Sequence, residues 1–212
     1  MPFDKKRKIL FIHIPKTGGT SIIKTLGLKV FHCHNLNGLF YDDFHITPQQ
    51  MLDQSNFTDC LTKEQFDSFF KFAFVRNPWD KLVSDYTKLW NNITFEMFLH
   101  YAEIAVNKHE NGEQFATKDL NSLLQSETIE SHFCPQYKFV TYNDEIIVDF
   151  LGRFENFSHD ITKVFNIIGE KTRVKHENHT NHGPYQNFYN ETTKQKVAYI
   201  YRKDIEMFNY EF

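Results

Sequence analysis

The sequence predicts an α/β protein whose central, mostly parallel sheet is flanked by helices within a single domain, residues 1–212. Continuous apolar runs, typical of strands buried on both faces, alternate with amphipathic segments of helical spacing. A chain of 212 residues suits one domain, and 41% hydrophobic with 24% charged residues excludes wholesale disorder.

The first part of the chain predicts a strand, a helix and a second strand. Residues 9–14 are an apolar run that ends at Pro15, and we expect a buried strand there. A helix is expected over residues 20–26, because Gly27 supplies a stop. Three elements should follow: a strand over 28–32, a helix from Thr47 with Pro48 at its first position, and a helix over 63–70.

A third strand is expected over residues 71–75, and it runs into a helix. Asn77 is a good N-cap residue, and Pro78 suits the first helical position. Apolar residues then recur at helical spacing on one face: Trp79, Leu82, Val83, Tyr86, Leu89 and Trp90. The other face carries polar residues: Asp80, Lys81, Ser84, Asp85 and Lys88.

The second half predicts strands over residues 137–140 and 146–154. Ser158 should cap a following helix that Gly169 ends. The last helix should begin near Thr192, which forms a capping box with Gln195. These elements complete the alternation of strands and helices.

Composition limits the classes of partner and compartment. A net charge of −3 argues against a nucleic-acid partner. The three cysteines lack a CxxC or zinc-ligand spacing, so we expect free thiols in a reducing compartment and no metal site. No apolar run suffices for a signal peptide or a membrane span, so a cytoplasmic protein is expected. The oligomeric state is not readable from the sequence.

The sharpest feature is the segment PKTGGTS at residues 15–21, between the first strand and the first helix. Two glycines let the backbone approach an anion, and the helix N-terminus offers N–H groups and a positive dipole end. The candidate phosphate ligands are Lys16, Thr17, Gly18, Gly19, Thr20 and Ser21. Because the lysine precedes the glycines, the loop is P-loop-like but not a Walker A loop. The competing interpretation is an ordinary tight turn.

A second anion site is predicted at the end of the third strand. Arg76 stands there, where open α/β sheets bind ligands, and Ser84 follows two turns into the next helix. Arginine can grip a phosphate bidentately while serine donates a hydroxyl.

The segments FIHIPKTGGTSI and FKFAFVRNPWDKLVSDY resemble the two signature segments of sulfotransferases that use 3′-phosphoadenosine 5′-phosphosulfate (PAPS), and the carbohydrate branch most closely. The resemblance implies that the loop at 15–21 holds the 5′-phosphosulfate and that Arg76 and Ser84 hold the 3′-phosphate. HTNHGPYQNFYN resembles the loop that closes over the nucleotide, which makes Tyr185 a candidate cofactor contact. The implied activity is sulfuryl transfer from PAPS to an acceptor hydroxyl, with a carbohydrate as the first candidate.

Such a transfer needs charge stabilisation and a base, and no metal. Lys16 is placed to neutralise the departing phosphate oxygen, and a histidine suits the general base. The position of His45 resembles that of the histidine base of some carbohydrate sulfotransferases. His32 and His34 are the alternatives.

Several interpretations stay open at this level. His132 and Gln136 are candidates to line the acceptor pocket, although a plain loop role explains them equally well. A P-loop nucleotide kinase using ATP and a noncatalytic nucleotide-binding relative are the alternative functions. The acceptor itself cannot be named from the sequence.

Overall fold

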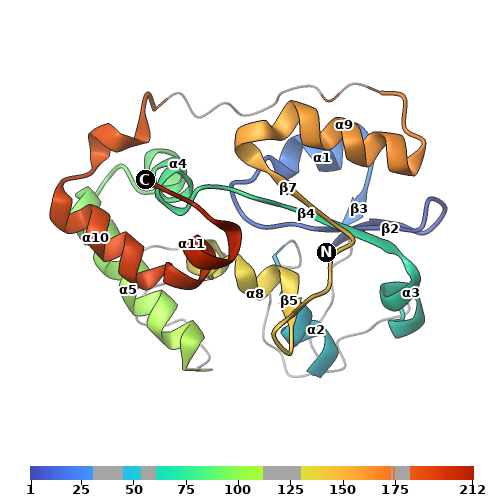
Figure 1. The fold of residues 1–212 in the computed structure, drawn as a ribbon, viewed down its shortest axis with the longest axis horizontal. Helices are drawn as coiled ribbons and strands as arrows, with labels where there is room; N and C mark the ends of the chain where they lie inside the picture. The colour runs from blue at the N-terminus through green and yellow to red at the C-terminus, as the bar shows by residue number, and fades with distance from the viewer. Residues whose placement is uncertain (31–44, 54–60, 112–129, 173, 175–181) are drawn as a thin grey trace. The chain divides into compact units, whose positions relative to one another are not determined.

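The computed structural model describes residues 1–30, 45–53, 61–111, 130–172, 174 and 182–212 (Figure 1). The chain forms two compact units. Unit 1 comprises residues 1–75 and 138–179, and unit 2 comprises residues 76–137 and 180–212. The α/β class is confirmed, whereas the assignment of residues 1–212 to a single domain stays a prediction.

Unit 1 contains a five-stranded sheet in the order β3-β1-β2-β4-β7. Its strands are β1 (Pro2–Asp4), β2 (Ile9–Ile12), β3 (Lys29–Val30), β4 (Phe70–Val75) and β7 (Phe150–Arg153). β2 pairs parallel with β4, and β4 pairs parallel with β7. β1 is antiparallel to both β2 and β3. The mostly parallel sheet is therefore confirmed, and β1 is an addition that its three residues were too short to signal.

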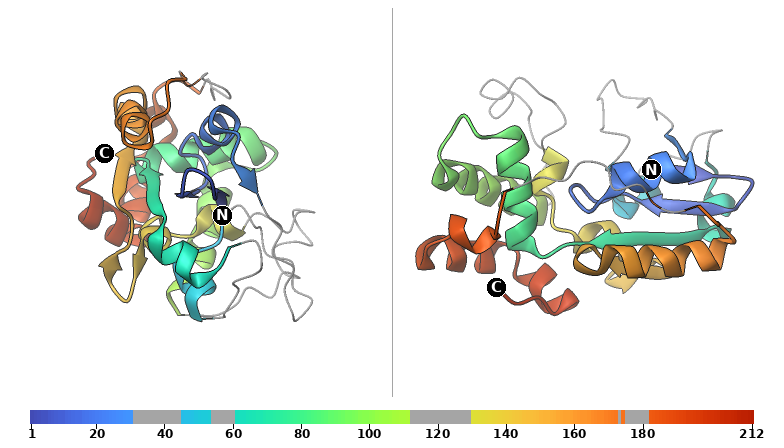
Figure 2. Two further views of the ribbon diagram at one scale, coloured as in Figure 1. Left: turned by 90° about the vertical axis from the view of Figure 1, so that its right-hand side faces the viewer. Right: turned by 90° about the horizontal axis from the view of Figure 1, so that it is seen from above.

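Two helices cover one face of this sheet. The views of Figures 1 and 2 place α1 (Gly19–Leu26) and α9 (Phe157–Ile168) side by side over the strands. Phe11 of β2 and Phe74 of β4 are buried in one core with Val164 of α9. Leu10 and Ala73, which point to the opposite face, are fully buried as well. Burial on both faces explains the continuous apolar run of β2.

The remaining elements of this part of the chain are short: α2 (Pro48–Asp53), α3 (Lys63–Ser68), α8 (Tyr137–Val140), β5 (Thr141–Tyr142), β6 (Glu145–Ile146) and η1 (Phe154–Asn156). The strand predicted over residues 137–140 is wrong, because this segment is the helix α8. Four apolar-rich residues suit a buried strand or a buried helical turn equally well. The strand predicted over 146–154 divides into β6 and β7, and the Asp149 carboxylate starts the β7 pairing by accepting the Lys71 N–H at 2.7 Å.

Glycines end two helices of unit 1 as predicted. Gly27 ends α1 with φ 59°, and Gly169 ends α9 with φ 70°. Both angles lie in the left-handed region that glycine adopts without strain. The predicted start of α9 is wrong, because Asn156 occupies the N-cap position and Ser158 lies inside the first turn.

Unit 2 is helical in its described residues: α4 (Pro78–Leu89), α5 (Phe95–Glu110), α7 (Glu130–Phe133), η2 (Tyr185–Phe188), α10 (Glu191–Ile200) and α11 (Arg202–Phe208). Trp90, Phe98 and Phe133 form the centre of its core, with ring centroids 5.3–5.5 Å apart. Much of the aromatic content of the sequence is thus packing material. None of the helices described is long and apolar enough to cross a membrane.

Two helix starts in unit 2 test the capping predictions. The Asn77 side chain accepts the Trp79 N–H at 3.0 Å, which confirms the predicted cap of α4. The capping box predicted for Thr192 and Gln195 is wrong. Asn190 and Thr193 form the box instead, because α10 begins at Glu191.

Candidate functional site

In unit 1, the segment at 15–21 forms a tight loop between β2 and α1. Lys16 has φ 65° and Gly18 has φ 86°, so two residues of the loop adopt left-handed backbone. The Thr17 hydroxyl donates to the Ile14 carbonyl at 2.8 Å and closes the loop from within. A lysine held at positive φ is strained, and such strain concentrates at functional positions.

Packing explains why the loop carries two glycines. A Cβ atom on Gly19 would lie 1.9 Å from Nε2 of His13, and one on Gly18 would lie 2.8 Å from the Phe157 ring. The two residues at the start of α1 therefore have no room for a side chain. Gly18 is the N-cap residue and makes no side-chain capping hydrogen bond, and the first turn contains no acidic residue. The leading N–H groups of a helix have no partner within it, so this end suits an anion.

The predicted phosphate ligands differ in exposure. Thr20 is exposed and Lys16 half-buried, whereas Thr17 and Ser21 are buried. Because the hydroxyl proton of Thr17 is already donated to Ile14, the structure gives this side chain a loop-closing role. Its phosphate contact stays a prediction, as do the contacts of the other loop residues.

His45 lies beside the loop, in contact with His13. The two ring centroids are 4.3 Å apart, and Nδ1 of His45 lies 3.0 Å from the His13 carbonyl oxygen. Because a carbonyl only accepts, Nδ1 of His45 carries the proton. Nε2 of the neutral ring then keeps its lone pair, which is the state a general base requires. His32 and His34, the alternative bases, lie outside the described residues.

Arg76, the first residue of unit 2, lies in the short link between β4 and α4. It is 5% exposed, and its Nε donates to Oδ2 of Asp80 at 2.7 Å. A guanidinium has five N–H donors in a fork that matches a phosphate. The hydroxyl of Tyr185 lies 3.4 Å from the Asn77 amide nitrogen, beside the cap of α4.

Most of the polar face of α4 is buried, and of its five polar residues Lys88 is the exposed one. Lys81 and Ser84 are each 1% exposed, and Asp85 is fully buried. Asp85 accepts from Nδ1 of His132 at 2.7 Å and lies 3.7 Å from the Lys81 ammonium. Buried charges need such partners, and the pattern predicted the polar residues but not their burial. Ser84 is buried on the same helix, directly before Asp85, and His132 has a partner in Asp85. The contacts predicted for Ser84 and His132 remain predictions.

Gln136 is fully buried, and its amide is hydrogen bonded to the main chain of Arg76. Its Oε1 accepts the Arg76 N–H at 2.9 Å, and its Nε2 donates to the Arg76 carbonyl at 2.7 Å. The structure thus gives Gln136 a supporting role, and the predicted acceptor contact stays a prediction.

Sequence reasoning did not single out His182, which lies beside the Asp80 carboxylate that pairs with Arg76. His182 has a side chain that is 8% exposed; its Nδ1 lies 2.8 Å from the Gly183 carbonyl, and its Nε2 lies 3.6 Å from the Asp80 carboxylate. No periodic or spacing signal distinguishes this histidine from the others in its polar segment. Only the fold brings it next to Asp80.

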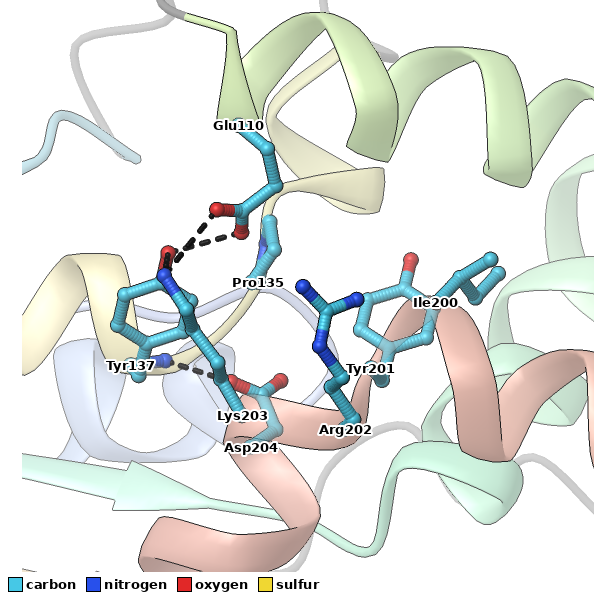
Figure 3. A pocket seen from close by; sticks show the side chains of 8 residues that line it. All are labelled: Glu110, Pro135, Tyr137, Ile200, Tyr201, Arg202, Lys203 and Asp204. Carbon is cyan, nitrogen blue, oxygen red and sulfur yellow. Dashed lines mark hydrogen bonds and ion pairs between the residues drawn. The ribbon is translucent and has the colours of Figure 1, made fainter.

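Figure 3 shows a pocket in unit 2 that contains none of the predicted site residues. The polar side chains in its wall are hydrogen bonded to one another: the Tyr137 hydroxyl donates to Glu110 at 2.8 Å, and the Lys203 ammonium lies 3.3 Å from the same carboxylate. Burial raises the pKa of Asp204 to about 6, although N–H groups of Tyr137 and Gln136 hydrogen bond to it.

Among the described residues, no cluster of three or more histidine, cysteine or acidic side chains could hold a metal ion.

The fold and the loop define a class: an α/β protein with a candidate anion site where a strand meets a helix. The chain belongs to the sulfotransferase family, whose sequence model matches residues 1–211. It is therefore a sulfotransferase-family enzyme, and its family relationship confirms the resemblance found in the sequence.

Individual relatives match about half of the chain. An uncharacterised protein of Archaeoglobus fulgidus is 32% identical over 107 residues, which are 50% of this chain and 73% of that protein. Human carbohydrate sulfotransferase 10 is 32% identical over 114 residues, which are 47% of this chain but only 28% of that protein. The chicken protein of the same name matches to the same extent. No solved structure matches the chain significantly.

The pKa of Asp204 tests whether its carboxyl group is buried as the structure describes. Its pKa is raised from the ordinary value of 3.8 to about 6, so protonation favours the folded state. Its contribution to stability is complete below the ordinary value and is lost as the pH rises through about 6. We expect the carboxyl carbon of Asp204 to titrate near pH 6 by NMR. The carboxyl of Asp160 should titrate below 3.8, because hydrogen bonds from Arg153 and Lys163 outweigh its desolvation. An Asp204 midpoint near 4 would contradict the buried placement.

Proposed function

We propose that this enzyme transfers the sulfuryl group of PAPS to a hydroxyl of a carbohydrate. The observation that carries the proposal is the loop at 15–21, which leads into the start of α1 without a side-chain cap. Its bare glycines and the strained Lys16 suit a phosphate group, in a chain of the sulfotransferase family.

Two sets of residues are proposed to hold PAPS. The loop binds the 5′-phosphosulfate through six residues: Lys16, Thr17, Gly18, Gly19, Thr20 and Ser21. Arg76 and Ser84 bind the 3′-phosphate, and Tyr185 contacts the nucleotide. The fit is chemical: an uncapped helix N-terminus and a buried guanidinium both favour anionic groups.

In the proposed mechanism, the acceptor oxygen forms a bond to sulfur while the bond from sulfur to the bridging phosphate oxygen breaks. PAPS supplies the sulfuryl group. Lys16 stabilises the negative charge on the departing oxygen, with help from the dipole of α1. Nε2 of His45 accepts the proton of the acceptor hydroxyl, since Nδ1 is committed to the His13 carbonyl.

The class of acceptor and the domain organisation complete the proposal. The relatives named carbohydrate sulfotransferase 10 support a carbohydrate acceptor. His132 stays a candidate acceptor contact. We also propose that both units function as one domain, which is supported by a single family model over residues 1–211. The cytoplasmic location remains a prediction.

A nucleotide kinase is the less favoured alternative. Lys16 precedes the two glycines, whereas a Walker A loop places its lysine after the last one. A noncatalytic relative differs from the proposal in activity alone, so transfer itself must be measured.

Thermal stabilisation tests the donor site. We expect adenosine 3′,5′-bisphosphate at 100 times its Kd to add about 2.7 kcal/mol, or about 5–10 °C in Tm. Arg76→Ala should abolish the shift, while the exposed Arg202→Ala control should keep it. A shift with ATP and Mg²⁺ but none with the bisphosphate would favour the kinase alternative.

Replacing Lys16 with glycine removes its charge while keeping a residue that adopts the same backbone conformation. Because Lys16 has φ 65°, Lys16→Gly should relieve strain and leave Tm unchanged or higher. Transfer of ³⁵S from labelled PAPS to a panel of saccharides should fall by about 10²–10³-fold, since a transition-state contact is lost. Lys24→Ala, an exposed lysine of α1, is the matched control. Full activity in Lys16→Gly would remove Lys16 from the mechanism.

His45→Asn tests the base. The asparagine amide can still donate to the His13 carbonyl but offers nothing at the position of Nε2. We expect kcat to fall by about 10²–10⁴-fold and the acidic limb of the pH–rate profile to disappear. His100→Asn, at an exposed position of α5, should behave as wild type. If His45→Asn keeps its activity, the same variants of His32 and His34 identify the base.

A further inference from the structure

One planar amide is hydrogen bonded to both main-chain groups of Arg76. Oε1 of Gln136 accepts the Arg76 N–H at 2.9 Å, and Nε2 donates to the Arg76 carbonyl at 2.7 Å. An amide side chain accepts through its oxygen and donates through its nitrogen at the same time. Gln136 is fully buried, so water does not compete for either bond. The Cα atom from which the Arg76 side chain projects is thereby fixed.

Asp204 of α11 in turn fixes Gln136. Its Oδ2 accepts the Gln136 N–H at 2.8 Å, and its Oδ1 accepts the Tyr137 N–H at 2.8 Å. Oδ2 also lies 3.5 Å from Nε2 of Gln136, which orients the amide. Asp204, Gln136 and Arg76 thus form one hydrogen-bonded chain that joins three segments of unit 2.

The far end of Arg76 is held as well. Oδ2 of Asp80 accepts from its Nε at 2.7 Å, which fixes the plane of the guanidinium. Bidentate phosphate recognition depends on that plane and on the position of its base, because a displacement of about 1 Å weakens such contacts severely. Main-chain support at one end and a carboxylate at the other make Arg76 a preorganised ligand.

We propose that Gln136 and Asp204 are positioning residues that aim Arg76 and so set the preference of this enzyme for nucleotides that bear a 3′-phosphate. The inference rests on the proposed role of Arg76 as the 3′-phosphate ligand. Neither residue is proposed to touch the nucleotide.

The cost of the arrangement argues for a role beyond packing. Asp204 is fully buried, and desolvation raises its pKa to about 6, so its charged form is held at the expense of stability. A well-packed apolar group is often at least as stable as a buried charge. Because Asp204 contacts the residue that holds Arg76, this cost is accounted for by the geometry that the carboxylate imposes on Gln136.

The test measures the 3′-phosphate preference by calorimetry, as the Kd of adenosine 5′-phosphate divided by the Kd of adenosine 3′,5′-bisphosphate. Gln136→Met keeps the size of the side chain but removes both bonds to Arg76. We expect the ratio to fall about tenfold, while the Kd of adenosine 5′-phosphate changes less than twofold. Tyr201→Phe is the matched control, because it deletes a buried hydrogen bond of 2.9 Å to the neighbouring Phe133 carbonyl without contacting Arg76. Its ratio should equal that of the wild type.

The outcomes separate the inference from the function on which it rests. A wild-type ratio near one would overturn the proposed 3′-phosphate site and the inference with it. A high wild-type ratio that Gln136→Met retains would overturn the inference alone. If Gln136→Met fails to fold, the side-chain ¹⁵N amide resonance of Gln136 in the wild type decides. It should shift with the bisphosphate and not with adenosine 5′-phosphate, and equal responses would overturn the inference.

Discussion

The parallel pairing of β2 with β4 is the constraint on which the proposed site depends. Its register runs from Ile9 opposite Phe70 to Ile12 opposite Ala73, with each of these strand residues except Phe70 buried. Because the strands are parallel, their carboxyl ends lie at the same edge of the sheet. The loop at 15–21 follows β2 at that edge, and the chain leaves unit 1 after Val75 of β4. The next residue along the chain is Arg76.

In unit 1 the proposed anion site consists largely of backbone, and packing dictates which of its residues lack a side chain. His13 and Phe157 occupy the space that side chains at positions 19 and 18 would need. The same His13 accepts a hydrogen bond from His45 through its carbonyl. One histidine therefore shapes the start of α1 with its ring and sets the tautomer of the proposed base with its main chain.

Unit 2 contains two groups of charged and polar side chains in its interior. Lys81, Asp85 and His132 form one buried polar group, and Arg76, Asp80 and His182 form another. Buried charges lower stability unless they are paired, and here Lys81 lies 3.7 Å from the Asp85 carboxylate and Arg76 lies 2.7 Å from that of Asp80. The abundant aromatic side chains around Trp90 and Phe98 supply the apolar burial that offsets such groups.

The sequence by itself determined the elements whose signals are local. The apolar runs of β2 and β4, the glycine stops of α1 and α9, and the Asn77 cap of α4 follow from residues within a few positions of each other. The tight loop at 15–21 belongs to the same group, because its glycines and lysine lie close together in the sequence.

Only the tertiary structure decided what depends on distant partners. Residues 137–140 form a helix although their apolar content suits a strand equally, and most of the polar face of α4 is buried because partners such as His132 reach it from other elements. Gln136 lies 60 positions from Arg76, and Asp204 lies 68 positions from Gln136. No pattern in a single segment encodes such pairings, since their geometry exists only once the chain has brought three separate segments together.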